Sequence, residues 1–183
     1  ARHDPDVITL QEISPTNEPL LAALRPNYPH QHRCHYGTSY SLAVLSRLPP
    51  TSSSPMCSDV RGLAAIEITA PDGPGWVASV HLFWPWPYAQ RPQVNEIAER
   101  LKALPGRKVV AGDFNQVPWS HAVKTLRRAS AANYLGPRRA TYSLHGIPLP
   151  IDHVLAPTGS VTRIPKHGSK HRGLLARIAF WPF

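Results

Sequence analysis

The sequence contains little cysteine and no long apolar run. Its 183 residues include two cysteines, Cys34 and Cys57, which lack the spacing of a metal site and are therefore either one disulfide or two buried thiols. No apolar run is long enough to cross a bilayer, and the residues after Ala1 do not form a signal peptide. These scarcities exclude a closely spaced cysteine metal motif and a bilayer-spanning segment within the printed sequence.

Acidic residues are also scarce relative to basic ones. Asp and Glu number 11 against 20 Lys and Arg, which gives a net charge of +9. A basic chain favours polyanionic partners, namely nucleic acid, phosphorylated small molecules or an anionic membrane surface, but a basic surface without a specific partner fits the same count. Because 42% of the residues are hydrophobic, we predict one core and a single domain over residues 1–183.

The pattern of apolar residues predicts short strands alternating with helices, and the 21 prolines favour short elements with many loops. Strands are expected over Asp6–Leu10, Ser41–Ser46, Leu63–Ile68, Trp76–Leu82, Lys108–Ala111, Ile151–Ala156 and Gly173–Phe180. Helices are expected over Glu18–Leu24, Gln90–Leu104 and Trp119–Arg128, and a loop over Pro49–Pro55. This alternation indicates an α/β protein, either a two-sheet sandwich or a doubly wound sheet.

One strand ends in a motif whose side chains could take part in catalysis, Gly112-Asp113-Phe114-Asn115. Residues two apart on a strand share a face, so Asp113 and Asn115 are expected to emerge side by side. Asp can take a proton or hold a metal, and Asn can donate a hydrogen bond to a phosphate oxygen. Taken alone, the motif is more typical of an Asx turn after a strand.

Four further segments place polar residues at the ends of apolar runs. They are Asp6–Glu12, with Gln-Glu at its end, Trp76–Leu82 with His81, Ile151–Leu155 with Asp-His, and Ser169–Ala176 with Ser-Lys-His. In this order the five motifs resemble the endonuclease/exonuclease/phosphatase superfamily, the fold of pancreatic-type deoxyribonuclease and of the exonuclease-type apurinic endonucleases. The resemblance runs from about Asp4 to Phe180. It implies a sandwich of two mixed sheets with helices outside.

The resemblance also implies a reaction, the in-line attack of water on a phosphate ester. Such a substrate needs its charge neutralised, which the family does with Mg²⁺ or Mn²⁺ held by oxygen ligands. Glu12 matches the metal-binding carboxylate, and Asp113 matches the residue that orients or deprotonates the water. Asn115 matches the phosphate-orienting partner of Asp113.

Three further positions match residues that act on the phosphate. His171 matches the histidine that stabilises charge on the phosphate, and Asp152 matches the carboxylate that fixes its tautomer. His81 matches a second histidine, which deoxyribonuclease-like members use as an acid or base. Other interpretations remain for three of these matches. Glu12 also fits an exposed strand-end charge, His81 a core-edge histidine bonded to backbone, and Asp152 the cap of a local turn; His153 is interpreted as structural.

Two departures from the family pattern affect the expected metal site. The family's Ser-Asp-His is Ser169-Lys170-His171 here, so an ammonium stands where a metal-site carboxylate is expected. A cation cannot ligate Mg²⁺ and repels it at contact distance, although Lys170 could instead pair with Glu12. The family's first strand, which carries a metal-site Asn, would lie before Ala1. We therefore expect an N-terminally truncated chain, which could once have carried a membrane anchor as some bacterial relatives do, and an extracytoplasmic or membrane-anchored monomer.

The sequence indicates the substrate less clearly than the reaction. Phe83–Tyr88 is aromatic and follows His81, so it is expected beside the site, where its rings would stack on bases, meet a membrane interface or form a packed lid. Two arginine pairs, Arg127-Arg128 and Arg138-Arg139, suit a phosphate backbone or are simply solvated. We predict a metal-dependent phosphohydrolase, a nuclease or phosphodiesterase. The alternative is a phosphate- or nucleic-acid-binding domain that has lost its metal ligands.

Overall fold

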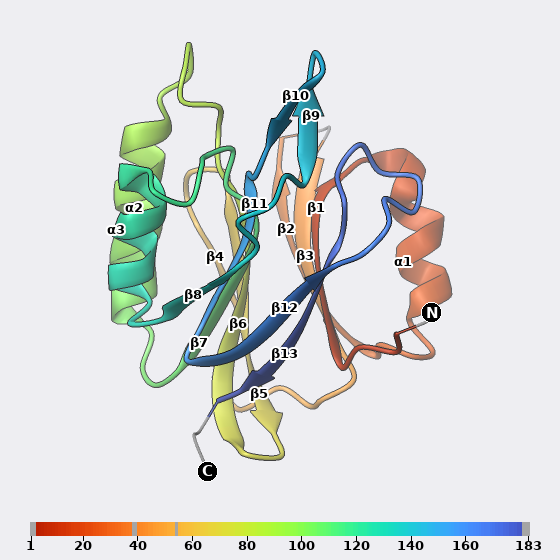
Figure 1. The fold of residues 1–183 in the computed structure, drawn as a ribbon. Helices are drawn as coiled ribbons and strands as arrows, with labels where there is room; N and C mark the ends of the chain where they lie inside the picture. Colours follow the sequence, from red (N-terminus) through yellow and green to blue (C-terminus); the bar gives the residue numbers. More distant parts are fainter. Residues whose placement is uncertain (1–2, 38–39, 54, 181–183) are drawn as a thin grey trace.

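The computed structural model describes residues 3–37, 40–53 and 55–180, and folds them into two stacked β-sheets with helices outside (Figure 1). The smaller sheet has the order β1-β3-β2 and is antiparallel throughout. Its strands are β1 (Val7–Ile13), β2 (His30–Tyr36) and β3 (Tyr40–Ser46). A short 3₁₀ turn (Pro15–Asn17) and α1 (Glu18–Leu24) connect β1 to β2, and α1 covers the outer face of this sheet.

The larger sheet has the order β4-β5-β6-β7-β11-β8 and is mixed, because β6 and β7 run parallel while its other pairs are antiparallel. Its strands are β4 (Met56–Cys57), β5 (Leu63–Ala70), β6 (Gly73–His81), β7 (Lys108–Asp113), β8 (Asn133–Gly136) and β11 (Asp152–Ala156). The outer face of this sheet is covered by α2 (Gln90–Ala103) and α3 (His121–Ala129), seen at the left of Figure 1. The predicted two-sheet sandwich is therefore confirmed, and the doubly wound alternative is wrong.

Two hairpins complete the fold. One joins β9 (Tyr142–Leu144) to β10 (Ile147–Leu149), and the other joins β12 (Thr158–Arg163) to β13 (Leu174–Ala179). The first hairpin projects at the same end of the sandwich as the loop before α2 (Figure 1). The second packs its apolar residues against the strands of the larger sheet.

Apolar residues explain why the layers stack. In β3, Leu42, Val44 and Leu45 are all buried, because the strand packs against the larger sheet on one face and near α1 on the other. In α2 the predicted face of Val94, Ile97, Ala98 and Leu101 packs onto the larger sheet. Burying a side chain of the size of Leu or Ile stabilises the fold by about 1.5–3 kcal/mol. The core therefore fixes which strand ends share an edge.

The structure differs from the predicted elements in several places. No strand was predicted at β2, because residues His30 to His35 are mostly polar and lack an apolar pattern. In the structure this strand lies at the edge of the smaller sheet and pairs with β3. The short strands β4, β8, β9, β10 and β12 were also not expected. The first strand continues three residues past its predicted end, to Ile13, through an irregularity between Leu10 and Ile13. The described residues of the Pro49–Pro55 loop lie outside helices and named strands, and Ser54 lies outside the described residues.

The two cysteines form a disulfide between Cys34 on β2 and Cys57 on β4. The sequence left this pairing open, because the two residues are 23 positions apart and only the stacked sheets bring them together. Within the described residues, no helix combines the length and the apolar character needed to cross a membrane.

Candidate active site

Three of the predicted site residues lie in one row across three neighbouring strands. In the register of the larger sheet, His81 at the end of β6 pairs with Asp113 at the end of β7, and Asp113 pairs with Asp152 at the start of β11. Mostly apolar residues precede His81 on β6 and Asp113 on β7, and follow Asp152 on the antiparallel strand β11, so these polar residues lie where the sheet reaches its edge. The register, set by packing, therefore places an imidazole and two carboxylates side by side.

The backbone around Asp113 has little freedom. Gly112 has a φ of 145°, and a Cβ there would lie 2.0 Å from the carbonyl oxygen of Val80, so only glycine fits. After Asp113 the chain turns: the backbone N–H of Asn115 donates to Oδ1 of Asp113 (2.8 Å), and Asn115 has a φ of 47°. The Asn115 side chain donates one N–H to the carbonyl of Leu82 (2.8 Å). The motif thus forms both the Asx turn and a fixed carboxylate.

The carboxyl group of Asp113 is buried, with 8% of the residue exposed. Burial, reinforced by the nearby charge of Asp152, raises the pKa of Asp113 to about 7. The Asn115 backbone N–H and the His171 imidazole oppose this rise without cancelling it. Asp113 is therefore a carboxylate that can take a proton near neutral pH, which is what a general base needs.

Asp152 holds His171. Both carboxylate oxygens of Asp152 accept from Nδ1 of His171, at 3.1 and 2.9 Å. One face of the imidazole stacks on the ring of Tyr142, with centroids 4.5 Å apart and an interplanar angle of 24°. Burial by itself would lower the pKa of His171, but the hydrogen bond to Asp152 and the surrounding carboxylates raise it overall. His171 is thus oriented, with its proton on Nδ1 and its Nε2 facing the site.

His81 is buried between two carboxylates. Its Nε2 lies 3.7 Å from Oε1 of Glu12 and 3.8 Å from Oδ2 of Asp113, while its Nδ1 is buried with no hydrogen-bond partner among the described residues. Burial lowers the pKa of His81 to about 4, so the ring is neutral at pH 7. We infer that its one proton lies on Nε2, because a buried N–H without an acceptor would be the more costly arrangement.

Glu12 enters the site from the smaller sheet. It lies in the irregular part of β1, with a φ of 55°, and its side chain is 61% exposed. Its neighbour Gln11 donates from Nε2 to the hydroxyl of Ser79 on β6 (2.8 Å), and that hydroxyl donates to the carbonyl of Leu10 (3.0 Å). These hydrogen bonds join the two sheets directly beneath the site and fix the strand that carries Glu12.

These residues form an alternating row of carboxylates and imidazoles. Its central atom is Oδ2 of Asp113, which lies 3.8 Å from Nε2 of His81 and 4.0 Å from Nε2 of His171. Both separations exceed a direct hydrogen bond, so the three groups leave room for an oxygen atom held among them. Ligand atoms of Asp113, Asp152 and His171 also lie within 4.8 Å of one another, a group able to hold a metal ion.

The suggested ion pair between Lys170 and Glu12 is not present among the described residues, and Lys170 is exposed. His153, interpreted as structural, is completely buried; its Nε2 lies 2.7 Å from the carbonyl oxygen of Gln116, and its Nδ1 lies 3.2 Å from the Tyr134 hydroxyl. The structure therefore places Glu12, His81, Asp113, Asp152 and His171 together, with Asn115 as a support of the turn.

Sequence reasoning missed Thr141 and Tyr142. The backbone N–H groups of Ile151 and Asp152 lie within hydrogen-bond distance of the Thr141 hydroxyl (3.3 and 3.2 Å), which fixes the start of β11, and Tyr142 stacks on His171. These residues lie in a segment without apolar periodicity, so no local pattern indicated them.

The aromatic segment Phe83–Tyr88 lies beside the site, as expected. The ring of Trp84 has its centroid 6.3 Å from that of Tyr142, which places Trp84 next to the ring that stacks on His171. Trp86 is 83% exposed, and Tyr88 is also exposed. The segment therefore does not form a completely packed lid.

A family model described as "Endonuclease/Exonuclease/phosphatase family" matches residues 1–172. Solved structures of similar fold include an endonuclease/exonuclease/phosphatase family protein from Leptotrichia buccalis, with 15% identity and a TM-score of 0.74 over 95% of this chain and 87% of that one. An AP endonuclease from Archaeoglobus fulgidus has 14% identity and a TM-score of 0.70, over 96% and 90% of the two chains.

A third similar structure is the 3′ phosphatase NExo from Neisseria bound to a product DNA hairpin, with 15% identity and a TM-score of 0.67, over 94% of this chain and 88% of that one. None of the curated proteins compared with this chain matches it.

Proposed function

We propose that this chain, which belongs to the endonuclease/exonuclease/phosphatase family, hydrolyses a phosphodiester in nucleic acid with the help of Mg²⁺ or Mn²⁺. The family and its structural neighbours act on phosphate esters, which supports phosphoester hydrolysis. The observation that carries the proposal is the position of Oδ2 of Asp113, about 4 Å from Nε2 of both His81 and His171. A phosphate and its attacking water would fit where these three groups converge.

Asp113 would act as the base. Its buried carboxylate has a pKa of about 7, so it can accept the proton of a water molecule as that water attacks phosphorus. Asn115 and Gly112 keep the carboxylate fixed, because one supplies a backbone N–H and the other allows the close approach to β6. The role of Asn115 in orienting the phosphate stays a prediction, and the second N–H of its carboxamide is the group that would perform it.

The two histidines would contact the phosphate in different ways. His171, with its raised pKa and its Nδ1 held by Asp152, would present a protonated Nε2 to a non-bridging oxygen and stabilise the charge that develops there. His81 is neutral at pH 7, so it would donate an uncharged hydrogen bond from Nε2. The expected acid or base role of His81 therefore requires a substrate that changes its pKa.

The site has ligands that suit a hard divalent cation. The neighbouring charge of Asp152 adds to burial in raising the pKa of Asp113, and a cation would relieve this repulsion. Glu12 adds an exposed carboxylate on the other side of His81. When bound by Glu12 and this acidic group, the ion would neutralise phosphate charge and lower the pKa of water.

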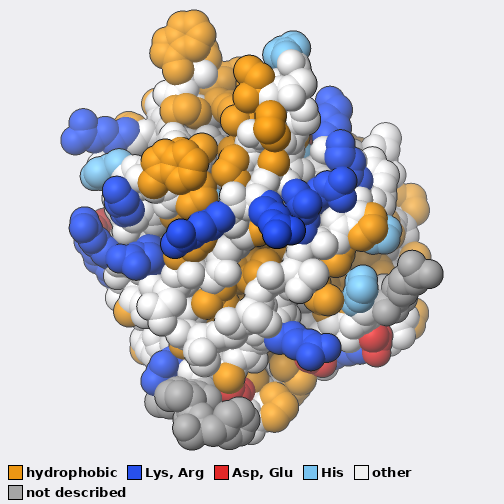
Figure 2. All heavy atoms as spheres, viewed as in Figure 1, with side chains coloured by type: hydrophobic (Ala, Val, Ile, Leu, Met, Phe, Trp, Pro, Cys, Tyr) orange, Lys and Arg blue, Asp and Glu red, His pale blue; other side chains and the backbone are white. Residues whose placement is uncertain are grey.

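The surface around the site suits an extended polyanion. Figure 2 shows a band of Lys and Arg side chains across the face that carries α3, β8 and β12, with few acidic side chains on it. Exposed cations that these elements and their loops contribute are Lys124, Arg127, Arg128, Arg138, Arg139 and Arg163. Aromatic groups on Trp84 and Trp86 lie at the rim, where bases could stack. This combination favours nucleic acid as the substrate, and the Neisseria neighbour is bound to a product DNA hairpin.

Direct hydrolysis tests the proposal. We expect the chain to cleave end-labelled DNA or bis(p-nitrophenyl) phosphate in Mg²⁺ or Mn²⁺, and to lose this activity in a chelator. His171→Ala should reduce the rate by about 10²-fold or more, because it removes the group that stabilises phosphate charge. His167→Ala is the matched control, since His167 is exposed in the same loop and should leave the rate unchanged. Equal rates in the two variants would contradict the assignment.

A second function is favoured by Lys170, which occupies the family position of a metal-site carboxylate. If the missing carboxylate abolishes metal binding, the chain would bind phosphate groups without hydrolysing them. Lys170→Asp should then raise the affinity for Mn²⁺ in calorimetry and increase the hydrolytic rate. A variant that binds metal no better than the parent chain would show that Lys170 does not line the metal site.

A further inference from the structure

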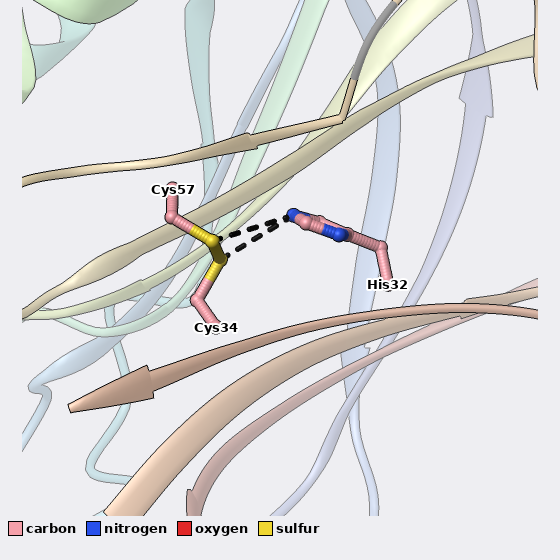
Figure 3. A group of neighbouring side chains, drawn as sticks. All are labelled: His32, Cys34 and Cys57. Atoms are coloured by element: carbon pink, nitrogen blue, oxygen red, sulfur yellow. Dashed lines mark hydrogen bonds between the residues drawn. A yellow bond between two sulfur atoms is a disulfide. The ribbon is translucent and has the colours of Figure 1, made fainter. Parts of the chain in front are cut away.

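A cluster of soft ligands lies at one edge of the sandwich, separate from the proposed active site. His32 and Cys34 are two residues apart on β2 and so share a face of that strand, and Cys57 reaches them from β4. These two strands terminate their respective sheets, so the Cys34–Cys57 disulfide fastens two sheet edges together. Figure 3 shows the His32 imidazole directed at both sulfur atoms.

The two nitrogen–sulfur separations in this cluster match those of a metal site, whereas the two sulfur atoms are bonded and must part before they can bind one ion. Nε2 of His32 lies 3.3 Å from Sγ of Cys34 and 3.8 Å from Sγ of Cys57. In a tetrahedral zinc site, Zn–N and Zn–S bonds place nitrogen and sulfur about 3.6 Å apart. The Cα atoms of the two cysteines are 5.6 Å apart, so two thiolates can reach one ion without moving the strands far.

We propose that reduction of the Cys34–Cys57 disulfide creates a Zn²⁺ site, formed by the two thiolates and Nε2 of His32. Cys57 is exposed and Cys34 is buried, so the ion would be held from the inside and keep a water molecule as its fourth ligand on the outer side. Thiolate and imidazole ligands select zinc over magnesium. The site would therefore be independent of the hard-cation site at Asp113.

A dithiol can supply the electrons and protons needed to reduce the Cys34–Cys57 disulfide. That dithiol gives two electrons and two protons to the disulfide, becomes a disulfide itself and leaves two cysteine thiols. Zinc binding then displaces the two thiol protons. In the oxidised form Nε2 of His32 lies 3.0 Å from the carbonyl oxygen of Met56. Binding of zinc needs a free lone pair on Nε2, so the imidazole proton would have to lie on Nδ1 and the Met56 carbonyl would lose this partner.

Such a site would keep the two sheet edges fastened in either redox state. The covalent bond joins β2 to β4 under oxidising conditions, and the metal would join the same strands under reducing conditions. Because neither β2 nor β4 has a second neighbouring strand in its sheet, this connection limits how far the sheets can separate at that edge.

Cobalt provides the test, since thiolate ligands give Co²⁺ an intense near-ultraviolet charge-transfer band that oxygen ligands do not. The full chain, freed of metal, is reduced by a water-soluble phosphine, which takes one water oxygen per disulfide and yields two thiols. We expect one Co²⁺ to bind to the reduced chain with this band, Zn²⁺ to displace it, and the oxidised chain to show no band. Folding is followed by near-ultraviolet circular dichroism.

Two variants isolate the role of the histidine. His32→Ala should weaken Co²⁺ and Zn²⁺ binding more than about 10-fold, because loss of even an indirect partner of a metal commonly has that effect. His35→Ala is the control. His35 is exposed on the same strand and directly follows Cys34, so its side chain points to the opposite face from Cys34 and His32. Equal affinity in His32→Ala, or a folded reduced chain without the band, would overturn the proposal. If reduction unfolds the chain, Zn²⁺ should restore the native dichroism, and failure to do so would also overturn it.

Discussion

At the scale of single residues, the site depends on a carboxylate that the fold keeps in an unfavourable place. Asp113 is buried beside Asp152, and its pKa of about 7 reflects the cost of ionising a carboxyl group that is buried and close to another carboxylate. Gly112 and the turn at Asn115 hold it there. The same environment that destabilises the carboxylate makes it a useful base near neutral pH.

Asp113→Asn should remove the hydrolytic activity and keep the fold. The carboxamide has the shape of the carboxylate but cannot take a proton, and loss of a positioned base typically reduces a rate by roughly 10²–10⁴-fold. Turnover of a phosphodiester by the two proteins measures the effect. Asp59→Asn is the control, because Asp59 is an exposed carboxylate paired with Arg100. Full activity in Asp113→Asn would exclude Asp113 from the mechanism.

The same substitution should change the pH dependence of stability. The folded-state pKa of Asp113, about 7, lies above its unfolded value near 3.8, so the group's contribution to stability is present below pH 4 and is lost as the pH rises to about 7. Asn has no such loss. In a chelator, Asp113→Asn should therefore melt above the parent chain at pH 8, by about 2–4 °C for each kcal/mol recovered, and the difference should shrink towards pH 4. A constant difference in Tm across this range would contradict the raised pKa.

At the scale of elements, the segment between β6 and α2 connects chemistry to substrate choice. It begins directly after His81, and its Trp84 ring lies near Tyr142, which stacks on His171. Gln93 of α2 anchors the segment, accepting from the backbone N–H of Phe83 at 2.7 Å. Its first residues are thus tied to the site, while Trp86 stays exposed.

The tryptophans of this segment should contribute to single-strand binding. If bases stack on them, Trp84→Ala or Trp86→Ala should weaken single-stranded DNA binding by roughly 1–3 kcal/mol, with little change in salt dependence. Fluorescence anisotropy at two salt concentrations measures both quantities. Trp119→Ala, which removes another exposed tryptophan, tests whether the effect belongs to this segment. Unchanged affinity in both segment variants would assign the segment to packing or to a membrane-facing role.

At the scale of the whole molecule, charge decides how the protein meets a polyanion. The net charge of +9 and the band of cations in Figure 2 give attraction without a helix arranged to read a DNA groove. The affinity of such a surface comes from phosphate contacts and released counterions. We therefore expect binding that depends strongly on salt and weakly on sequence.

The salt dependence of DNA binding gives a number to this expectation. The slope of log K against log salt should be about −0.9 for each phosphate neutralised on duplex DNA. Arg138→Ala should make this slope shallower by about 1, since it removes one exposed cation of the band. Lys102→Ala is a control, because Lys102 already pairs with Glu99 on α2. Binding that does not respond to salt would contradict the electrostatic origin.

The local patterns of the sequence predicted most residues of the candidate site and, through the resemblance to a known family, the class of fold. Apolar runs that end in Glu12, His81 or Asp113 are local patterns, and a strand delivers its final residues to a sheet edge wherever that sheet packs. The order of these motifs carried the resemblance to a family, and that resemblance implied the two-sheet sandwich that the structure confirms. Helix boundaries agreed within a few residues for the same reason, since the apolar face of α2 is periodic.

The way in which these residues meet depends on the tertiary structure. The register between β6, β7 and β11 places His81, Asp113 and Asp152 in one row, and register depends on packing over the whole sheet. The pKa of Asp113 comes from burial and from a neighbour 39 positions away in the chain, which no local pattern contains. The strand β2 and the pairing of Cys34 with Cys57 likewise depend on stacking of the two sheets, because a polar terminal strand takes its structure from the partner beside it.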